Sequence, residues 1–166
     1  MAVNEHYELA GHKQYHIQCG PGDIGKYVLL PGDPGRISLI ASLLDDVREV
    51  AYNREHRTIT GTYKGITVSA TSTGMGCPST AIAVEELIKA GAKVLVRVGS
   101  TAGIADRVSD GDYILPTGAV PLEGASPIYL DNDPFAHVPD FEVLRTLHDV
   151  ASETGKRVHT GVVLVH

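Results

Sequence analysis

The sequence predicts an α/β fold in which helices cover both faces of a largely parallel or mixed β-sheet. Short apolar runs alternate with segments of helical periodicity, and turns rich in Gly and Pro follow several of these runs. The composition agrees, with 43% hydrophobic residues, 18 Gly and no Trp among 166 residues. This length suits one domain with a sizeable core, so we expect residues 1–166 to form a single domain.

An arm, a strand and a helix come first. The first two dozen residues are punctuated by Gly and are expected to be extended. Residues 27–30 form an apolar run, and a buried strand is predicted over residues 26–30. Apolar residues then recur at helical spacing over residues 36–45, so that one face of this segment is apolar, and the pattern predicts a helix.

Three strands and a second helix follow. The strands are expected at residues 47–53, 57–64 and 66–71. Lys64-Gly65 predicts a tight hairpin turn between the last two strands. Residues 78–90 predict a helix, because Pro78 is tolerated in a first helical turn and Gly91 lies just past the end.

The second half of the chain repeats the alternation of strand and helix. Its predicted elements are strands at residues 93–98 and 112–120, a helix at residues 141–153 and a closing strand at residues 157–165. Scattered Pro and Gly indicate a long functional loop over residues 122–139. The closing apolar strand has no helix after it, so we expect the C-terminal part of the fold to lie beyond His166.

Charge and cysteine content exclude several classes of protein. The formal net charge is −6 and no basic stripe is present, which argues against binding nucleic acid. No apolar run is long enough to cross a bilayer, and the N-terminus does not resemble a signal peptide. Cys19 and Cys77 lie far apart without CxxC spacing, so neither a disulfide framework nor a zinc site is supported. We therefore expect a cytoplasmic protein.

The turn at residues 31–36 is the most informative stretch of the chain. It follows an apolar strand and precedes a helix, so its backbone N–H groups and the positive end of the helix dipole suit an anion. Gly32 allows a close backbone approach, and Arg36 offers a bidentate fork for phosphate. An ordinary capped turn is the alternative, so the anion hypothesis depends on other residues converging here.

Two further strand-to-loop junctions resemble this turn. Residues 72–79 follow one predicted strand, and residues 97–101 end another. If these strands are parallel, all three junctions lie at one edge of the sheet. Arg97 interrupts the apolar run of its strand, and a guanidinium in such a setting is rarely without an anion. A structural ion pair with Asp or Glu remains open as the alternative.

Other motifs are weaker. Gly74-Met75-Gly76 lies between strand and helix as in a dinucleotide-binding fingerprint, but no carboxylate occurs about 20 residues later. Glu85 and Glu86 are adjacent on a helix and point in different directions, so they are interpreted as a solvated edge rather than an acid/base pair.

The order of these motifs resembles the nucleoside phosphorylase-I family, and within it most closely the uridine phosphorylases. Five motifs in the correct order are more specific than any one of them. Residues 123–126 and Tyr15-His16 strengthen the likeness to that branch over the hexameric purine nucleoside phosphorylases. The motifs are Pro31-Gly32-Asp33-Pro34-x-Arg36, Asn53-Arg54-Glu55, residues 72–79, residues 83–87, and Arg97-Val98-Gly99-Ser100-Thr101.

The resemblance implies a three-layer αβα fold around a mixed sheet, and reversible attack of inorganic phosphate on a nucleoside to give ribose 1-phosphate and free base. Phosphate would be the co-substrate, with no organic cofactor. His16 would bind ribose, and a K⁺ or Na⁺ ion would lie at a subunit interface. The implied phosphate ligands are Gly32, Arg36, Arg54, Arg97, Ser100 and Thr101, with Arg36 and Arg97 as the catalytic residues. The implied cation ligands are Glu55, Met75 and Ser79.

The resemblance also implies a homo-oligomer, built from dimers and expected to be a hexamer, because Arg54 and His16 would reach a neighbouring subunit's site. The family's base-recognition segment and its Glu-Met-Glu ribose motif would lie beyond His166, so uridine is inferred from overall likeness, and residues 1–166 alone are not expected to turn over substrate. A purine or methylthioadenosine phosphorylase, a nucleosidase, and a non-catalytic nucleoside- or phosphate-binding fragment remain the alternatives.

Overall fold

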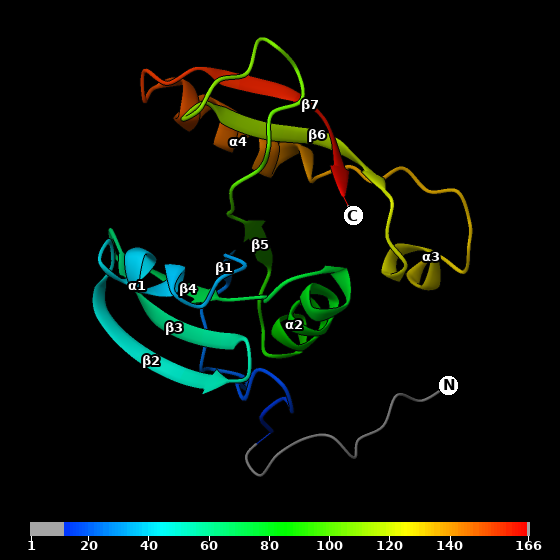
Figure 1. Ribbon diagram of the computed structural model, residues 1–166. Coiled ribbons are helices and arrows are strands. Elements are labelled where there is room, and N and C mark those ends of the chain that lie inside the picture. The colour runs from blue at the N-terminus through cyan, green and yellow to red at the C-terminus, as the bar shows by residue number, and fades with distance from the viewer. Residues whose placement is uncertain (1–11, 166) are drawn as a thin grey trace. The chain divides into compact units, whose positions relative to one another are not determined.

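The computed structural model describes residues 12–165, and the chain divides into two compact units between Gly99 and Ser100. Figure 1 shows the elements of both units, which are described separately below. The helices are α1 (Arg36–Ala41), α2 (Cys77–Lys89), α3 (Ala125–Tyr129) and α4 (Phe141–Ser152). The strands are β1 (Tyr27–Leu30), β2 (Asp45–Asn53), β3 (His56–Tyr63), β4 (Ile66–Thr71), β5 (Val94–Arg97), β6 (Tyr113–Pro121) and β7 (Val158–Val165).

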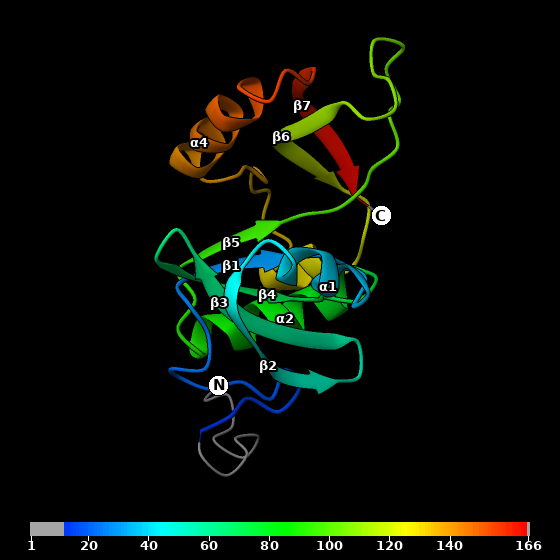
Figure 2. The ribbon, with the colours of Figure 1, turned by 90° about the vertical axis from the view of Figure 1, so that its left-hand side faces the viewer.

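The first unit contains a mixed five-stranded sheet in the order β2-β3-β4-β1-β5. Strand β1 pairs in parallel with both β4 and β5 (Figure 2). Strands β2, β3 and β4 are antiparallel to their neighbours. The predicted mixed sheet is therefore confirmed, and its parallel part brings the carboxyl ends of β1, β4 and β5 to one edge.

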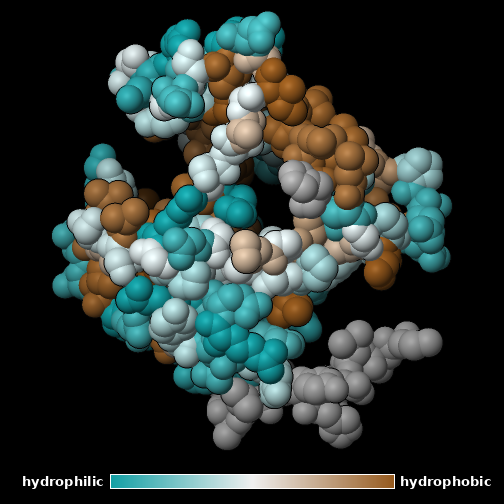
Figure 3. All heavy atoms as spheres, viewed as in Figure 1, coloured by the Kyte–Doolittle hydropathy of each residue, from teal (hydrophilic) through white to brown (hydrophobic). Residues whose placement is uncertain are grey.

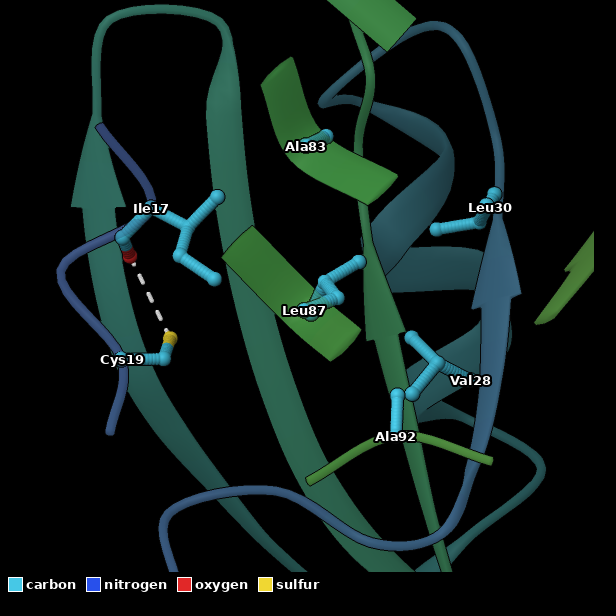
Figure 4. Packing of buried hydrophobic residues seen from close by; sticks show 7 residues of the cluster. All are labelled: Ile17, Cys19, Val28, Leu30, Ala83, Leu87 and Ala92. Atoms are coloured by element: carbon cyan, nitrogen blue, oxygen red, sulfur yellow. Dashed lines mark hydrogen bonds between the residues drawn. The ribbon is translucent and has the colours of Figure 1, made fainter. Parts of the chain in front are cut away.

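Helices α1 and α2 cover opposite faces of this sheet. Side chains alternate between faces along a strand, so Val28 and Leu30 point to one face and Leu29 to the other. Val28 and Leu30 pack with Ala83 and Leu87 of α2 (Figure 4). Leu29 packs against the cluster of Ile37 from α1 with Ile59 and Ala70. The result is three layers in the order helix, sheet and helix, as the sequence predicts.

Local turn chemistry explains where most elements of this unit begin and end. Lys64 and Gly65 both have positive φ, 49° and 79°, which matches the two-residue hairpin turn predicted there. Pro78 lies in the first turn of α2, and Gly91 follows its end with φ 111°. Helix α1 is shorter than predicted, because the chain turns after Ala41 and Asp45 already pairs with Thr62 of β3.

The second unit contains a parallel pair, β6 and β7, with α4 packed against both strands. Asp140 begins α4 by accepting a hydrogen bond from the Val143 amide (3.0 Å). A short helix, α3, lies inside the segment predicted as loop, because the Glu123 carboxylate accepts hydrogen bonds from its first amides. Apolar residues gather over β6 and β7 in Figure 3. Exposed ones in these strands include Val120, Val162 and Leu164. Across residues 12–165, each helix is too short or too polar to span a bilayer.

Candidate functional site

The site predicted from the sequence lies at the edge of the first unit's sheet where β1, β4 and β5 end. The loops that follow these strands stay in contact after the strands stop. Three backbone hydrogen bonds join them: Thr73 N to Pro31 O (2.9 Å), Gly74 N to Gly32 O (2.9 Å) and Val98 N to Leu30 O (3.1 Å). The parallel pairing thus produces the convergence of three junctions that the sequence predicts.

Arg97 is the last residue of β5, and its guanidinium lies at this edge. Its register partner is Leu30 of β1, and its Nη1 donates to the Leu30 and Val98 carbonyl oxygens, each at 3.2 Å. A Cβ added to Gly32 would lie 3.1 Å from Arg97 Nη2, so this side chain passes directly beside Gly32. Among residues 12–165 no carboxylate forms an ion pair with Arg97, so the structural ion pair considered above is not formed. Its positive charge is held by carbonyl groups and remains available to an anion.

Several backbone amides of the turn after β1 donate hydrogen bonds to other atoms of the same turn. The Asp33 side chain accepts from Gly35 N (2.8 Å), and the Asp33 and Pro34 carbonyls accept from Arg36 N and Ile37 N. The expectation that the start of α1 presents free N–H groups to an anion is therefore wrong for these three amides. Helix α1 also has only six residues, so its dipole is weak. The arginines must supply most of the attraction for a phosphate.

The hairpin turn between β2 and β3 reaches the same edge of the sheet. Strand β3 runs antiparallel to β4, so its start lies beside the end of β4. Ser72 joins the two segments: its Oγ donates to the Glu55 carbonyl (2.5 Å), and its amide donates to the Arg57 carbonyl (3.0 Å). Arg54, exposed in this turn, has φ 55°, a left-handed conformation uncommon outside Gly, Asn and Asp.

Oxygen atoms cluster where this turn meets the start of α2. Ser79 Oγ lies 2.8 Å from Glu55 Oε1 and 2.6 Å from the Thr73 carbonyl oxygen. The hydroxyl has one hydrogen for two acceptors, which leaves an excess of oxygen lone pairs. The Ser79 hydroxyl is the main cause that lowers the pKa of the Glu55 carboxyl, which is therefore ionised at neutral pH.

These oxygens fit a hard monovalent cation, and two of the three predicted cation ligands, Glu55 and Ser79, lie together. The third, Met75, is in the same loop with a 95% exposed residue surface. Among residues 12–165 there is no cluster of three His, Cys, Asp or Glu side chains suited to a transition metal.

His16 is held beside the same hairpin turn. Its carbonyl oxygen accepts a hydrogen bond from the Asn53 side-chain amide (2.7 Å), and Asn53 is the residue before Arg54. The two residues expected to reach a neighbouring subunit, His16 and Arg54, are thus tied to one local structure within this unit. On its other side, the His16 ring lies against the Glu86 carboxylate, with 2.6 Å between Nδ1 and Oε1.

Arg36, Ser100 and Thr101 are the remaining predicted phosphate ligands. Arg36 opens α1 directly after the turn at Gly32 and is half-buried. Ser100 and Thr101 are exposed residues at the start of the second unit, immediately after Gly99. Their participation in the site stays a prediction.

Sequence reasoning missed Glu86, which is 8% exposed and not part of a solvated edge. The interpretation of Glu85 as solvated is confirmed, since that residue is exposed. The missed signal is helical spacing: position 86 follows Ala83 by three residues and precedes Ala90 by four, and both are buried. A carboxylate on the apolar face of a helix indicates a specific partner.

The sequence profile of the phosphorylase superfamily matches residues 26–165. The chain belongs to this superfamily. It is 51% identical over 149 residues to a uridine phosphorylase of Thermococcus kodakarensis, a match that covers 90% of this chain. It is 38% identical over 152 residues to a guanosine phosphorylase of Halorubrum lacusprofundi, with 92% of this chain covered.

Solved structures in the phosphorylase superfamily share the fold. A crystal structure of uridine phosphorylase from Vibrio fischeri aligns with 93% of this chain at a TM-score of 0.90 and 37% identity. These findings confirm the family resemblance and the predicted fold class. The chain spans 53% of the length of the Thermococcus relative, 63% of the Halorubrum relative and 64% of the Vibrio chain.

Proposed function

We propose that this chain forms the phosphate-binding part of a pentosyltransferase that splits uridine with inorganic phosphate. In this reaction a phosphate oxygen forms a bond to C1′ of the ribose while the bond from C1′ to the base breaks. The electron pair of that bond leaves with uracil, which then takes up a proton. The products are ribose 1-phosphate and free base, and no oxidant or organic cofactor is required.

The observation that carries this proposal is the Arg97 guanidinium beside Gly32, where three loops join and no carboxylate among residues 12–165 forms an ion pair with Arg97. Cleavage of a glycosidic bond builds positive charge on the sugar, and a phosphate dianion held next to it stabilises that charge. Arginines offset the desolvation of the phosphate and fix its direction of attack. Arg36, Ser100 and Thr101, together with Arg54 of a neighbouring subunit, would complete the phosphate shell around Gly32 and Arg97.

The proposed preference for uridine is based on the names of related proteins. The Thermococcus protein and the Vibrio structure are named uridine phosphorylases, whereas the Halorubrum relative is named a guanosine phosphorylase. A purine nucleoside is therefore the second candidate substrate, supported by that 38% identity. In cells the reaction would serve pyrimidine salvage in the cytoplasm.

The proposed active form is a homo-oligomer built from dimers, with a hexamer as the expected assembly. His16 would hold the sugar 5′-hydroxyl of a neighbouring subunit, and Arg54 would contact its phosphate. Their shared attachment through Asn53 supports a joint role. A K⁺ or Na⁺ ion at the subunit boundary, held by Glu55, Ser79 and the Met75 carbonyl, would stabilise the turn that presents Arg54.

Substitution of Arg97 tests the proposed function. In the complete gene product, Arg97→Ala is expected to lower kcat/KM for phosphate by about a hundredfold, the scale of losing one charged transition-state contact. Initial rates of uridine phosphorolysis, measured as ribose 1-phosphate over a range of phosphate concentrations, provide the readout. Arg145→Ala is the matched control, because Arg145 is exposed on α4 and pairs with Glu142.

Each alternative has a distinct outcome in the same assay. Uridine cleavage that is independent of phosphate would indicate a nucleosidase, which uses water. Faster turnover of guanosine than of uridine would move the substrate to the purines. Calorimetric binding of phosphate with no product from any nucleoside would indicate a binding module. An Arg97→Ala enzyme with an unchanged rate at limiting phosphate would contradict the phosphate site itself.

A further inference from the structure

Among residues 12–165, Glu86 is a buried acidic side chain that the proposed function does not use. It lies on α2, is 8% exposed, and faces the N-terminal arm. Its carboxylate accepts hydrogen bonds from the His16 amide (3.0 Å) and the Ile17 amide (2.8 Å), both to Oε2. The His16 amide also lies 3.2 Å from Oε1, and the His16 ring adds a contact of 2.6 Å between Nδ1 and Oε1. Among residues 12–165, no Lys or Arg pairs with this carboxylate.

Packing fixes the position of the arm relative to α2. Ile17 and Cys19 are fully buried and belong to the same cluster as Ala83 and Leu87 of α2 (Figure 4). The residue after His16 is thus anchored on the same helix face as Glu86. The Asn53 amide holds the His16 carbonyl from the other side. The backbone of His16 is therefore held in place on both sides. Glu86 then determines which ring nitrogen of His16 carries the hydrogen.

A carboxylate and an amide would impose opposite states on this ring. An ionised carboxylate has only acceptor atoms, so Nδ1 must carry the hydrogen when it bonds to Glu86. Nε2 of the neutral ring then has a free lone pair, and no residue among 12–165 occupies it. A glutamine could still accept both backbone amides through its oxygen, but its NH₂ group would face Nδ1 and require Nδ1 to be the acceptor. The hydrogen would then move to Nε2.

The free-energy cost of burying a carboxylate suggests why residue 86 is glutamate and not glutamine. Burying a carboxylate without a cation is more costly than burying an amide of the same size. A glutamine would accept both backbone amides through its oxygen at lower cost. Glutamate adds a second acceptor oxygen, which faces Nδ1 at 2.6 Å and lies 3.2 Å from the His16 amide. The His16 side chain is 31% accessible, so the ring is not enclosed by the protein.

We propose that Glu86 is a positioning residue that holds the hydrogen of His16 on Nδ1, so that Nε2 accepts a hydrogen bond from the sugar 5′-hydroxyl of the nucleoside. This inference rests on the proposed function and deepens it, because it assigns a direction to the ribose contact: the substrate hydroxyl donates and the enzyme accepts. A substrate whose 5′ group cannot donate a hydrogen bond is therefore expected to react less efficiently.

A substrate pair measures this direction. In 5′-deoxy-5′-fluorouridine, fluorine replaces the hydroxyl at similar size but cannot donate. The complete gene product is expected to prefer uridine over this analogue by about tenfold in kcat/KM, the scale of one hydrogen bond. Glu86→Gln moves the ring hydrogen to Nε2, where it can face fluorine, so the preference is expected to fall to about twofold or less. His16→Phe, which keeps a planar ring without nitrogens, is expected to lose the preference as well.

Glu85→Gln is the matched control, since it makes the same chemical change at an exposed position next in sequence. It is expected to keep the full preference for uridine. A purely structural role for Glu86 would slow both substrates by the same factor and leave their ratio unchanged. That unchanged ratio in a folded Glu86→Gln enzyme would overturn the proposal, and so would a wild-type enzyme that does not distinguish the two substrates.

Direct observation of the ring separates this inference from the proposed function. In protein labelled with ¹⁵N-histidine and measured at alkaline pH, the resonances missing from His16→Phe identify His16. Wild-type protein is expected to show a protonated Nδ1 and a bare Nε2, with the reverse in Glu86→Gln. The measurement requires no turnover, so it tests the Glu86 contact even if uridine is not a substrate. A wild-type ring with its hydrogen on Nε2 alone would refute the contact between Nδ1 and Glu86. This test uses the wild-type protein, so it remains decisive if Glu86→Gln does not fold.

Discussion

Gly32 shows how the absence of a side chain can define a binding position. A Cβ at this residue would lie 3.1 Å from Arg97 Nη2 and 3.4 Å from the Gly74 carbonyl oxygen. The second distance is an ordinary contact, but the first is tight, so the flexible end of Arg97 would move by a few tenths of an ångström. The requirement for Gly here comes from the guanidinium beside it, because the turn backbone itself does not need a left-handed conformation.

Gly32→Ala is therefore expected to weaken phosphate binding more than it lowers the stability of the fold. The displaced guanidinium should raise the KM for phosphate by about tenfold, while the free energy of unfolding changes by less than about 1 kcal/mol. Phosphate-dependent kinetics and urea denaturation of the complete gene product measure the two effects. Gly161→Ala is the control, since no atom lies within 4 Å of a Cβ built there. Equal loss of stability and activity would show that Gly32 serves only the fold.

At the scale of elements, the hairpin between β3 and β4 contains a residue that its turn does not favour. Lys64 has φ 49°, and a side chain other than Gly, Asn or Asp costs about 1 kcal/mol in this region. Its amine lies 5.3 Å from the Tyr63 ring centroid, an exposed cation–π contact that contributes about 0.5 kcal/mol. The backbone cost is larger than this contact.

Lys64→Asn is accordingly expected to raise the free energy of unfolding by about 0.5 kcal/mol, because Asn-Gly is the preferred pair for this turn. Lys64→Ala should lower it slightly, since alanine loses the ring contact without gaining the turn preference. Urea titrations of both variants provide the comparison. If both variants shift stability in the same direction, backbone conformation does not control this turn.

Sequence predicts elements well where local signals agree with the pairing of the sheet. The hairpin turn at Gly65, the start of α2 at Pro78 and the convergence of three strand ends all follow from such signals. The early end of α1 does not, because pairing of Asp45 with β3 overrides helical periodicity. Helix α3 depends on a single carboxylate cap at Glu123, which a segment rich in Pro and Gly conceals.

The candidate site is also predictable only in part, because some of its contacts join residues that lie far apart in the sequence. Arg97 and Gly32 come together because their strands are neighbours, and the sequence order of the motifs already suggests this. Glu86 acts through a contact with residues 16 and 17, about 70 positions away in the chain. No local pattern encodes that contact; only the helix spacing of Glu86 indicates that the carboxylate is buried.

At the scale of the whole molecule, the two units contain titrating groups that act at opposite ends of the pH range. In the first unit, burial is the main cause that raises the pKa of the Cys19 thiol from 9.0 to about 11. In the second unit, the Ser109 amide and then the His159 ring lower the pKa of the Asp112 carboxyl below 3.8. The first unit is therefore most stable while the Cys19 thiol is neutral. The second unit is most stable while the Asp112 carboxyl is ionised.

The signs of the two dependences follow from linkage. A raised thiol pKa contributes stability that is fully present below pH 9 and is lost as the pH rises towards 11. A lowered carboxyl pKa contributes stability that is present above pH 3.8 and is lost as the pH falls through the folded-state value. Because Cys19 and Asp112 belong to different units, alkali should weaken residues up to Gly99 through Cys19, and acid should weaken residues after Gly99 through Asp112. The Glu55 carboxyl, whose pKa is also lowered, adds an acid dependence to the first unit.

Hydrogen exchange at a series of pH values tests this division, since it reports protection for each half of the chain separately. Cys19→Ala is expected to remove an alkaline loss on the order of 2 kcal/mol from the first unit, whereas Cys77→Ala, at the first residue of α2, should keep it. Asp112→Asn is expected to flatten the acid response of the second unit, and the exposed Asp110→Asn should not. Loss of protection in both halves at the same pH, in every variant, would mean that neither group controls its unit and that the two units unfold as one.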